Sequence, residues 1–451
     1  MAKYQKYAKY KDSGVEWLEN VPREWDIIKI KHLSTVKRGA SPRPIDDPKY
    51  FDDNGEYAWV RIADVSASDM YLLNTTQTMS DLGSSLSVKL EPNQLFLSIA
   101  GTVGKPCINK IKACIHDGFV YFPELKIPNK YLFYVFAGEQ AYKGLGKMGT
   151  QLNLNTDTVG DIKVALPKSQ SDIYKIIEFL DHETTKIDHL IEKQQQLIEL
   201  LKEKRQAVIS HAVTKGLDPN VPMKDSGVEW LGKVPEHWNM APVRRYLVEH
   251  RQGYYTTESY VDEGLKLLRI TDLRDLGEIN ISNCPMVNES DTTHLFKLQK
   301  GDVVFARTGG AGSFGVITED YENLIYASYL IRFRFMNKIF EPDYLRFLFQ
   351  SDSFQLSVKQ NIHGGVNQNI HAEDIKNTVI CAPSLSEQKE IIEYLENQCL
   401  LFENLIYKAS YSVKLMQERR TALISSTVTG KIDVRNWQAP TVAEADTELS
   451  A

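Results

Sequence analysis

Residues 171–215 read SDIYKIIEFLDHETTKIDHLIEKQQQLIELLKEKRQAVISHAVTK, and residues 386–430 read SEQKEIIEYLENQCLLFENLIYKASYSVKLMQERRTALISSTVTG. The two stretches have equal length, and neither contains a proline or a glycine before Gly216 or Gly430. The a and d positions of a heptad repeat hold Ile187, Leu190, Gln194, Leu197, Leu201 and Val208 in the first stretch and Phe402, Leu405, Ala409, Ser412, Met416 and Leu423 in the second. Each stretch therefore predicts one uninterrupted helix of about 35 to 40 residues.

Helices of this length are far longer than those of an ordinary globular core. Their apolar seams are flanked by Glu, Lys and Gln, which is the pattern of helices that pack on each other as a coiled coil. We expect the two helices to run antiparallel and to form a spine that carries the segments between them.

A second repeat supports an internal duplication. KDSGVEWLENVPREW at 11–25 returns as KDSGVEWLGKVPEHW at 224–238, with eleven of fifteen positions identical, and we call these two segments the leading motifs. Each is followed by mixed sequence with strand character and then by a long helix. The predicted fold is α+β, with two mixed α/β domains and a pseudo-twofold repeat. The expected boundaries are 1–168 for the first mixed domain, 169–215 for the first helix, 216–385 for the second mixed domain, 386–435 for the second helix and 436–451 for a flexible tail.

The mixed domains diverge far more than the leading motifs and the helices do. YAWVRIADV at 57–65 and LKLLRITDL at 265–273 predict one pair of corresponding strands. A scaffold that repeats while its interior changes suits two related modules that face different targets.

Composition fits a folded protein of more than one domain. The chain has 451 residues, of which 42% are hydrophobic and 25% charged. It has no run of 18 apolar residues and no apolar core of a signal peptide near its start, so we expect no membrane partner. Its five cysteines form no CxxC pair and no zinc spacing, which predicts reduced thiols and a cytoplasmic protein.

No motif predicts catalysis. The two GxGxxG matches lack the strand, turn and helix of a dinucleotide site, and GTVGKP at 101–106 is not a phosphate-binding Walker loop. The chain contains no Pro-Pro, so it lacks the turn with which base-amino methyltransferases grip a flipped base. We therefore expect a binding protein with no catalytic, cofactor-binding or metal-binding residues.

The chain resembles the specificity (S) subunit of type I restriction-modification systems. The resemblance rests on Asp12–Trp25 and Asp225–Trp238 in the leading motifs, and on KRQAVISHAVTKGLD at 204–218 and ERRTALISSTVTGKID at 418–433. It implies that each mixed domain is a target recognition domain that reads one half of a split, asymmetric DNA sequence. It also implies that the helices space the domains and bind methyltransferase subunits, of which we expect two, while restriction subunits join through those. S-adenosylmethionine and ATP then belong to the partners, and this chain needs no cofactor.

The candidate contacts rest on physical type, because variable domains do not transfer residue by residue. Loops with Arg, Lys, Asn, Gln and close-approach glycines suit contacts to phosphates and base edges of double-stranded DNA. The DNA-binding candidates are Lys37, Arg38, Ser41, Arg43, Lys105, Gln151 and Asn153 in the first domain and Arg251, Gln252, Tyr254, Tyr255, Arg307, Thr308, Asn367 and Gln368 in the second. The candidates for binding methyltransferase subunits are Lys204, Arg205, Arg419 and Arg420.

Two other classes of function stay open. The net charge of −6 favours a coiled-coil scaffold whose mixed domains bind peptides or proteins, since dedicated nucleic-acid binders are usually basic. An enzyme in its own right would show turnover from the purified chain alone. DNA binding in low salt, where phosphate contacts are strongest, separates the first alternative from the S-subunit interpretation.

Overall fold

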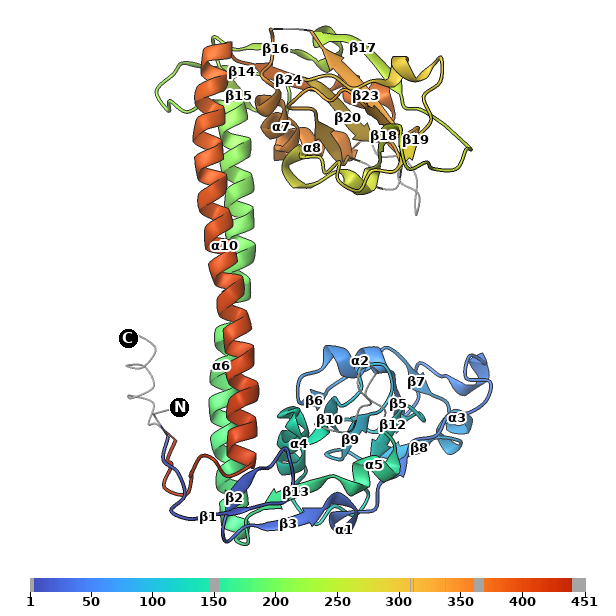
Figure 1. Cartoon of the computed structure of the whole chain (residues 1–451), viewed down its shortest axis with the longest axis vertical. Helices are drawn as coiled ribbons and strands as arrows, with labels where there is room; N and C mark the ends of the chain where they lie inside the picture. Colours follow the sequence, from blue (N-terminus) through green and yellow to red (C-terminus); the bar gives the residue numbers. More distant parts are fainter. Residues whose placement is uncertain are drawn as a thin grey trace. The chain divides into compact units, whose positions relative to one another are not determined.

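The computed structural model describes residues 4–143, 145, 154–308, 310, 312–336, 338–360 and 369–439. The chain forms two compact units, one of Met1–Gln194 with Tyr411–Ala451 and the other of Gln195–Ser410. It therefore passes between the units twice, each time within a long helix (Figure 1). Among the described residues, no helix combines the length and the apolar character needed to cross a bilayer.

The two long helices are α6 (Gln170–Lys215, 46 residues) and α10 (Leu385–Val428, 44 residues). The predicted pair of long helices is confirmed, and both are longer than the expected 35 to 40 residues. Each is followed closely by a glycine with positive φ, Gly216 at 77° and Gly430 at 69°. Glycine adopts this left-handed conformation without a steric penalty, and helices commonly end in this way.

The helices run antiparallel in both units. In the first unit Asp188 of α6 accepts two hydrogen bonds from Arg420 of α10, at 2.7 and 3.1 Å, while Lys175, earlier in α6, donates to the carbonyl of Trp437. In the second unit, the end of α6 meets the start of α10, and buried side chains of both helices join one core. These side chains are Ile209, Ala212 and Val213 of α6 and Ile391, Leu395 and Cys399 of α10.

The predicted seam is buried unevenly. Ile187 and Leu423 in the first unit, and Phe402 in the second, are less than 10% exposed. By contrast Leu197 and Leu405, both in the second unit, keep 42% and 40% of their surface exposed. Part of the predicted apolar seam therefore stays exposed to solvent in this chain.

The first mixed domain is built on two sheets, with strand orders β4-β12-β9-β10-β6 and β7-β5-β11-β8. A further pair, β13-β3, lies beside α6, and β1-β2 is a hairpin of the leading motif. Its elements are β1 Tyr10–Asp12, β2 Asn20–Pro22, β3 Asp26–Lys29, α1 Ile30–Leu33, β4 Lys37–Arg38, η1 Pro48–Tyr50, β5 Tyr57–Val60, α2 Ile62–Ala67, β6 Tyr71–Leu72, β7 Thr78–Met79, α3 Asp81–Ser85, β8 Val88–Leu90, β9 Leu95–Ser98, β10 Pro106–Asn109, β11 Ala113–Ile115, β12 Phe119–Tyr121, α4 Asn129–Ala137, η2 Gln140–Tyr142, α5 Thr156–Asp161 and β13 Lys163–Leu166.

The second mixed domain repeats this plan. Its sheets have the orders β17-β23-β20-β21 and β19-β18-β22, and its paired strands are β16-β24 and β14-β15. Its elements are β14 Met223–Asp225, β15 Lys233–Pro235, β16 Asn239–Pro242, η3 Val243–Tyr246, β17 Leu247–Gln252, β18 Leu265–Leu268, η4 Ile270–Asp272, η5 Asp275–Gly277, β19 Met286–Val287, η6 Thr293–Phe296, β20 Asp302–Ala306, β21 Phe314–Val316, β22 Leu324–Tyr326, β23 Leu330–Phe335, α7 Pro342–Gln350, α8 Asp352–Gln360, α9 Ala372–Asn377 and β24 Val379–Ala382.

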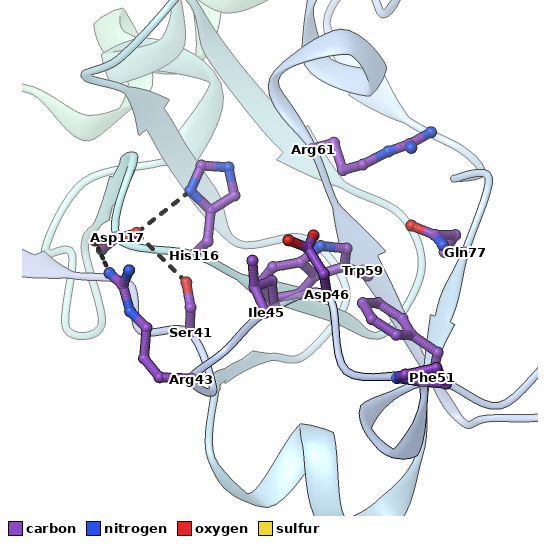
Figure 2. A pocket seen from close by; sticks show the side chains of 11 residues that line it. Ser41, Arg43, Ile45, Asp46, Phe51, Trp59, Arg61, Gln77, His116 and Asp117 are labelled. Atoms are coloured by element: carbon purple, nitrogen blue, oxygen red, sulfur yellow. Dashed lines mark hydrogen bonds and ion pairs between the residues drawn. The ribbon is translucent and has the colours of Figure 1, made fainter.

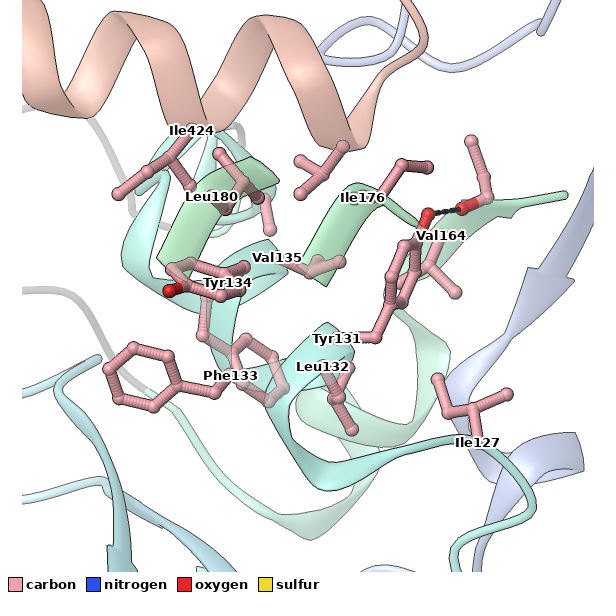
Figure 3. Packing of buried hydrophobic residues seen from close by; sticks show 14 of the residues in the cluster. Ile127, Tyr131, Leu132, Phe133, Tyr134, Val135, Val164, Ile176, Leu180 and Ile424 are labelled. Carbon is pink, nitrogen blue, oxygen red and sulfur yellow. Dashed lines mark hydrogen bonds between the residues drawn. The ribbon is translucent and has the colours of Figure 1, made fainter. Parts of the chain in front are cut away.

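A short aromatic helix joins each mixed domain to the long helices. Buried residues from Tyr131 to Phe136 in α4 pack in one cluster with Ile176 and Leu180 of α6 and Ile424 of α10 (Figure 3). The Tyr131 hydroxyl donates to the carbonyl of Ala165 at 2.8 Å, which satisfies its polar group inside the core. Burial raises the pKa of this phenol, so the hydroxyl stays protonated.

Each leading motif packs on the end of the long helix that belongs to the other repeat. Trp238, 1% exposed, lies beside Gly216 at the end of α6 and donates from Nε1 to Glu387 Oε1 at 2.9 Å. Trp25 and Pro22 lie beside Gly430 at the end of α10. The first motif, at the start of the chain, therefore packs on the second helix, and the second motif packs on the first.

These two glycines give a matched test of the helix ends. At position 216 an added Cβ would make an ordinary 3.4 Å contact with Trp238, so Gly216→Ala should cost about 1 kcal/mol of unfolding free energy from the left-handed conformation alone. At position 430 it would overlap the Pro22 ring, which adds about 1–3 kcal/mol of overpacking. Urea unfolding of the two variants should show the larger loss for Gly430→Ala. Equal losses would contradict this packing.

Candidate nucleic-acid interface

Strand registers place the two mixed domains on one common framework. β11 pairs with β5 so that Cys114 faces Trp59, and β22 pairs with β18 so that Ile325 faces Leu267. Next to these strands, Gly39 lies against the carbonyl of His116. Gly253 lies against the carbonyl of Ala327 in the same way. A side chain at either glycine would overlap this carbonyl, so both copies need glycine at this close approach.

The candidates at the end of β4 and β17 occupy equivalent positions. Gly39 and Gly253 follow directly, so Arg38 corresponds to Gln252. Arg38 donates from Nε to the carbonyl of Asp117, and Gln252 donates from Nε2 to the carbonyl of Ser328 at 2.9 Å. One residue earlier, Lys37 is exposed in β4, and Arg251 is its counterpart. Arg38 and Gln252 therefore lie at equivalent positions of the two domains, and their contacts to DNA stay predictions.

In the first domain a carboxylate organises this edge. Asp117 accepts from Ser41 Oγ at 3.4 Å and from Arg43 Nη2 at 3.1 Å (Figure 2). Both candidates are thus held in place by one carboxylate that is not among the predicted DNA contacts. Burial lowers the pKa of the neighbouring His116, and Asp117 offsets part of this shift, so the ring is neutral near pH 7.

The β9–β10 turn of the first domain and the β20–β21 turn of the second hold further DNA-binding candidates. In the first domain the β9–β10 turn begins where the Ile99 amide donates to Gly118, and in the second domain the Arg307 amide donates to Tyr329 at the start of the β20–β21 turn. Arg307 is exposed and Thr308 forms a bridge with Asn369. Lys105, at the end of the first turn, donates to the carbonyl of Ser66 at 2.8 Å, and burial lowers the pKa of its ammonium group.

The aromatic candidates of the second domain differ in exposure. Tyr254 is half-buried, with its ring 5.4 Å from that of Phe296 in an edge arrangement, so it packs within the domain. Arg251 lies over the same Phe296 ring at 6.0 Å. Tyr255 is 74% exposed and is free to meet a ligand. Gln151, Asn153, Asn367 and Gln368 lie outside the described residues and stay predictions.

The candidates on the long helices have different surroundings. Lys204 and Arg419 are exposed, whereas Arg205 is half-buried in a cavity of about 870 Å³ beside α8 of the second unit. Arg420 is engaged by Asp188 in the ion pair that joins α6 to α10 in the first unit. This contact gives Arg420 a structural role, and its binding to a methyltransferase subunit stays a prediction.

A repeated Arg-x-x-Asp motif was missed by the sequence analysis. The predicted strand at 57–65 is a strand only to Val60, and the one at 265–273 only to Leu268. In each copy the chain then turns into a short helix, because Asp64 accepts from the Arg61 amide at 2.9 Å and Asp272 accepts from the Arg269 amide at 2.9 Å. The sequence signal was present as RIAD and RITD.

Within the described residues, no group of three or more His, Cys, Asp or Glu side chains is placed to hold a metal ion. All five cysteines are buried free thiols. The described edge instead offers guanidinium, ammonium, amide, hydroxyl and phenol groups on loops that a rigid sheet supports. These groups are the ones that contact phosphates and base edges.

Comparison with known proteins agrees with this arrangement. The profile of the type I restriction modification DNA specificity domain matches twice, at residues 22–199 and 266–404. The MjaVIII type I restriction enzyme specificity subunit of Methanocaldococcus jannaschii is 22% identical over 430 residues, which cover 92% of this chain and 95% of that protein. The EcoKI specificity subunit of Escherichia coli K12 is 25% identical over 276 residues, and these span 58% of this chain and 56% of that protein.

A solved structure shares the fold. A chain from work on complex assembly and conformational transition of the type I restriction-modification system superposes with a TM-score of 0.66 at 13% identity, covering 91% of this chain and 99% of that one. The two matches of the specificity-domain profile cover more than half of the sequence and fall on the two copies of the repeated framework. The chain therefore belongs to the family of type I restriction-modification DNA specificity subunits.

Proposed function

We propose that this chain reads a bipartite, asymmetric DNA target, with one half-site contacted by each mixed domain. The observation that best supports this proposal is that the two domains share one strand framework but carry different side chains at equivalent positions. Arg38 in the first domain corresponds to Gln252 in the second, and two positions after the close-approach glycine Ser41 corresponds to Tyr255. Symmetric readers go with symmetric targets, so two unlike edges favour two unlike half-sites.

The chain acts as a non-catalytic subunit in this proposal. Its specificity domains bind DNA, and its long helices dock methyltransferase subunits, through which restriction subunits join. Exposed apolar side chains support this docking: Leu200, Leu400 and Leu401, all on the helices of the second unit, are between 51% and 60% exposed. Two repeats offer two docking places, which favours two methyltransferase subunits.

Partner subunits also account for how a chain with negative net charge binds DNA. A net charge of −6 disfavours tight binding to DNA by the chain alone, because the phosphate contacts that dominate such affinity need local positive charge. Methyltransferase subunits that enclose the duplex supply further contacts, and they carry the S-adenosylmethionine. The complex works in the cytoplasm, where reduced thiols such as the five found here persist.

The test is the methylated motif of a cell that carries the whole system. Single-molecule sequencing of its DNA should show methylation at a split motif whose two half-sites differ. A strain that lacks only this chain is the control, and it should lose that motif. A continuous motif, or a split motif with palindromic half-sites, would overturn the proposal.

A further inference from the structure

A cavity of about 740 Å³ opens on the first mixed domain, next to the edge described above (Figure 2). The loop that follows β4 forms one wall, and the ends of β5 and β11 form the floor. Trp59, His116 and Phe51 give this cavity apolar and aromatic surfaces. An open hollow of this kind, with a few polar groups, suits the edge of a base that a DNA groove presents.

The polar groups of the cavity fall into two sets. Arg43 is held by Asp117 at 3.1 Å, and Arg61 is held by Asp64 and by the Thr76 hydroxyl. Asp46 and Gln77, by contrast, have no side-chain hydrogen bond or ion pair with any residue that the structure describes. Figure 2 shows the Asp46 carboxylate in front of Trp59, with the Asp117 cluster on one side of the view and Gln77 on the other. Two hydrogen-bonding groups therefore remain available to a ligand.

The second domain has other residues at the corresponding places. The Trp59 amide donates to the carbonyl of Gln77 at 2.9 Å, and the Leu267 amide donates to the carbonyl of Pro285 at 2.8 Å. Gln77 therefore corresponds to Pro285, and Trp59 corresponds to Leu267. The residue after β11 is His116, and the residue after β22 is Ala327.

The strand framework is thus the same in the two domains, whereas the side chains that line the site differ. The Arg-x-x-Asp cap at Arg61 is retained as Arg269 at the edge of the corresponding site. Three lining positions, however, change from polar or aromatic to aliphatic or small residues. A retained frame with an exchanged lining is what two modules need when they read different sequences.

We propose that this cavity is a base-reading site of the first domain, in which Gln77 and Asp46 select a base that carries an exocyclic amino group. This inference rests on the proposed function of the chain. Gln recognises the amino group and N7 of adenine, and a carboxylate accepts from the amino group of cytosine, so both residues select against bases that present an oxygen there. Arg43 and Arg61, fixed by their own partners, stand at the rim where they can hold flanking phosphates.

The experiment compares the methylated motif of the intact complex for Gln77→Ala, Asp46→Ala and Asp46→Asn. Each variant should relax one position of the half-site read by the first domain, with discrimination falling about 5- to 150-fold there. The other half-site and the gap should stay unchanged. Asp53→Ala is the matched control, because Asp53 is an exposed carboxylate of the same domain that does not line the cavity. It should leave the whole motif unchanged.

Three results would overturn the proposal. The first is an unchanged motif in all three cavity variants, and the second is a relaxed position in the half-site of the second domain. The third is an equal loss of methylation at every sequence with an unchanged Tm, since a phosphate contact weakens all sequences alike. Asp46→Asn guards against misfolding because it keeps the size of the side chain. If the unaltered complex methylated no split motif at all, the proposed function itself would fail, which is a distinct result.

Discussion

A chain that lacks one heptad in each long helix, Ile187–Lys193 in α6 and Phe402–Lys408 in α10, should methylate a target whose two half-sites are unchanged but lie closer together. Each helix loses about 10 Å at 1.5 Å per residue, and its face turns by only about 20°, so the remaining a and d positions stay aligned. The deletion also removes Asp188, and with it the ion pair to Arg420. At about 3.4 Å per base pair, this shortening corresponds to roughly three base pairs of DNA. The gap in the motif, measured by single-molecule sequencing, should therefore shrink by about two to four base pairs.

The matched control removes five residues from each helix, Ile187–Ile191 and Phe402–Ile406. This deletion turns each helix face by about 140°, which points the seam away from its partner. We expect this variant to lose assembly and methylation. An active heptad-deleted chain that kept the original gap would show that something other than the helices sets the spacing.

Trp238→Ala should remove much of the stability of the second unit. Trp238 is 1% exposed and is among the largest fully buried side chains. Its loss leaves a cavity and an unpaired Glu387 Oε1, and buried Trp→Ala changes typically cost about 3–5 kcal/mol. Since whole domains are stable by only about 5–15 kcal/mol, the variant should expose the second unit at moderate temperature.

Hydrogen exchange followed by mass spectrometry measures this effect unit by unit. Faster exchange should be confined to residues 195–410, with residues of the first unit protected as before. Trp230→Ala is the control, because Trp230 lies in the same leading motif but is only half-buried. A Trp230 variant as unstable as the Trp238 variant would mean that burial at the end of α6 does not govern this stability.

The long helices could be predicted because their signal adds up over many residues. Forty or more positions repeat one period, and a glycine stops each helix, so local errors average out. The strand at 57–65 was predicted too long because Asp64 caps the chain into helix α2, and one side-chain hydrogen bond decides this locally. A single capping hydrogen bond of this kind hardly changes the hydrophobic periodicity from which strands are predicted.

The candidate site could be predicted in part. Choosing basic and amide residues beside glycines found Arg38 and Gln252, which make equivalent hydrogen bonds in the two domains. It missed Asp46, Gln77 and His116, because the cavity that joins them is assembled from segments far apart in the sequence. No local pattern marks residues that only strand pairing brings together.

The way each leading motif packs on the opposite helix has a consequence for the origin of the repeat. Each unit contains the first part of one long helix and the last part of the other, as in a domain-swapped pair. A half-length chain with one motif, one mixed domain and one helix would lack the helix end that completes its unit. Two such chains would supply it to each other across a twofold axis and would read a palindromic split target. Joining them through Gly216 and the residues that follow it keeps every swapped contact, and it lets each half change the sequence it reads without altering the other.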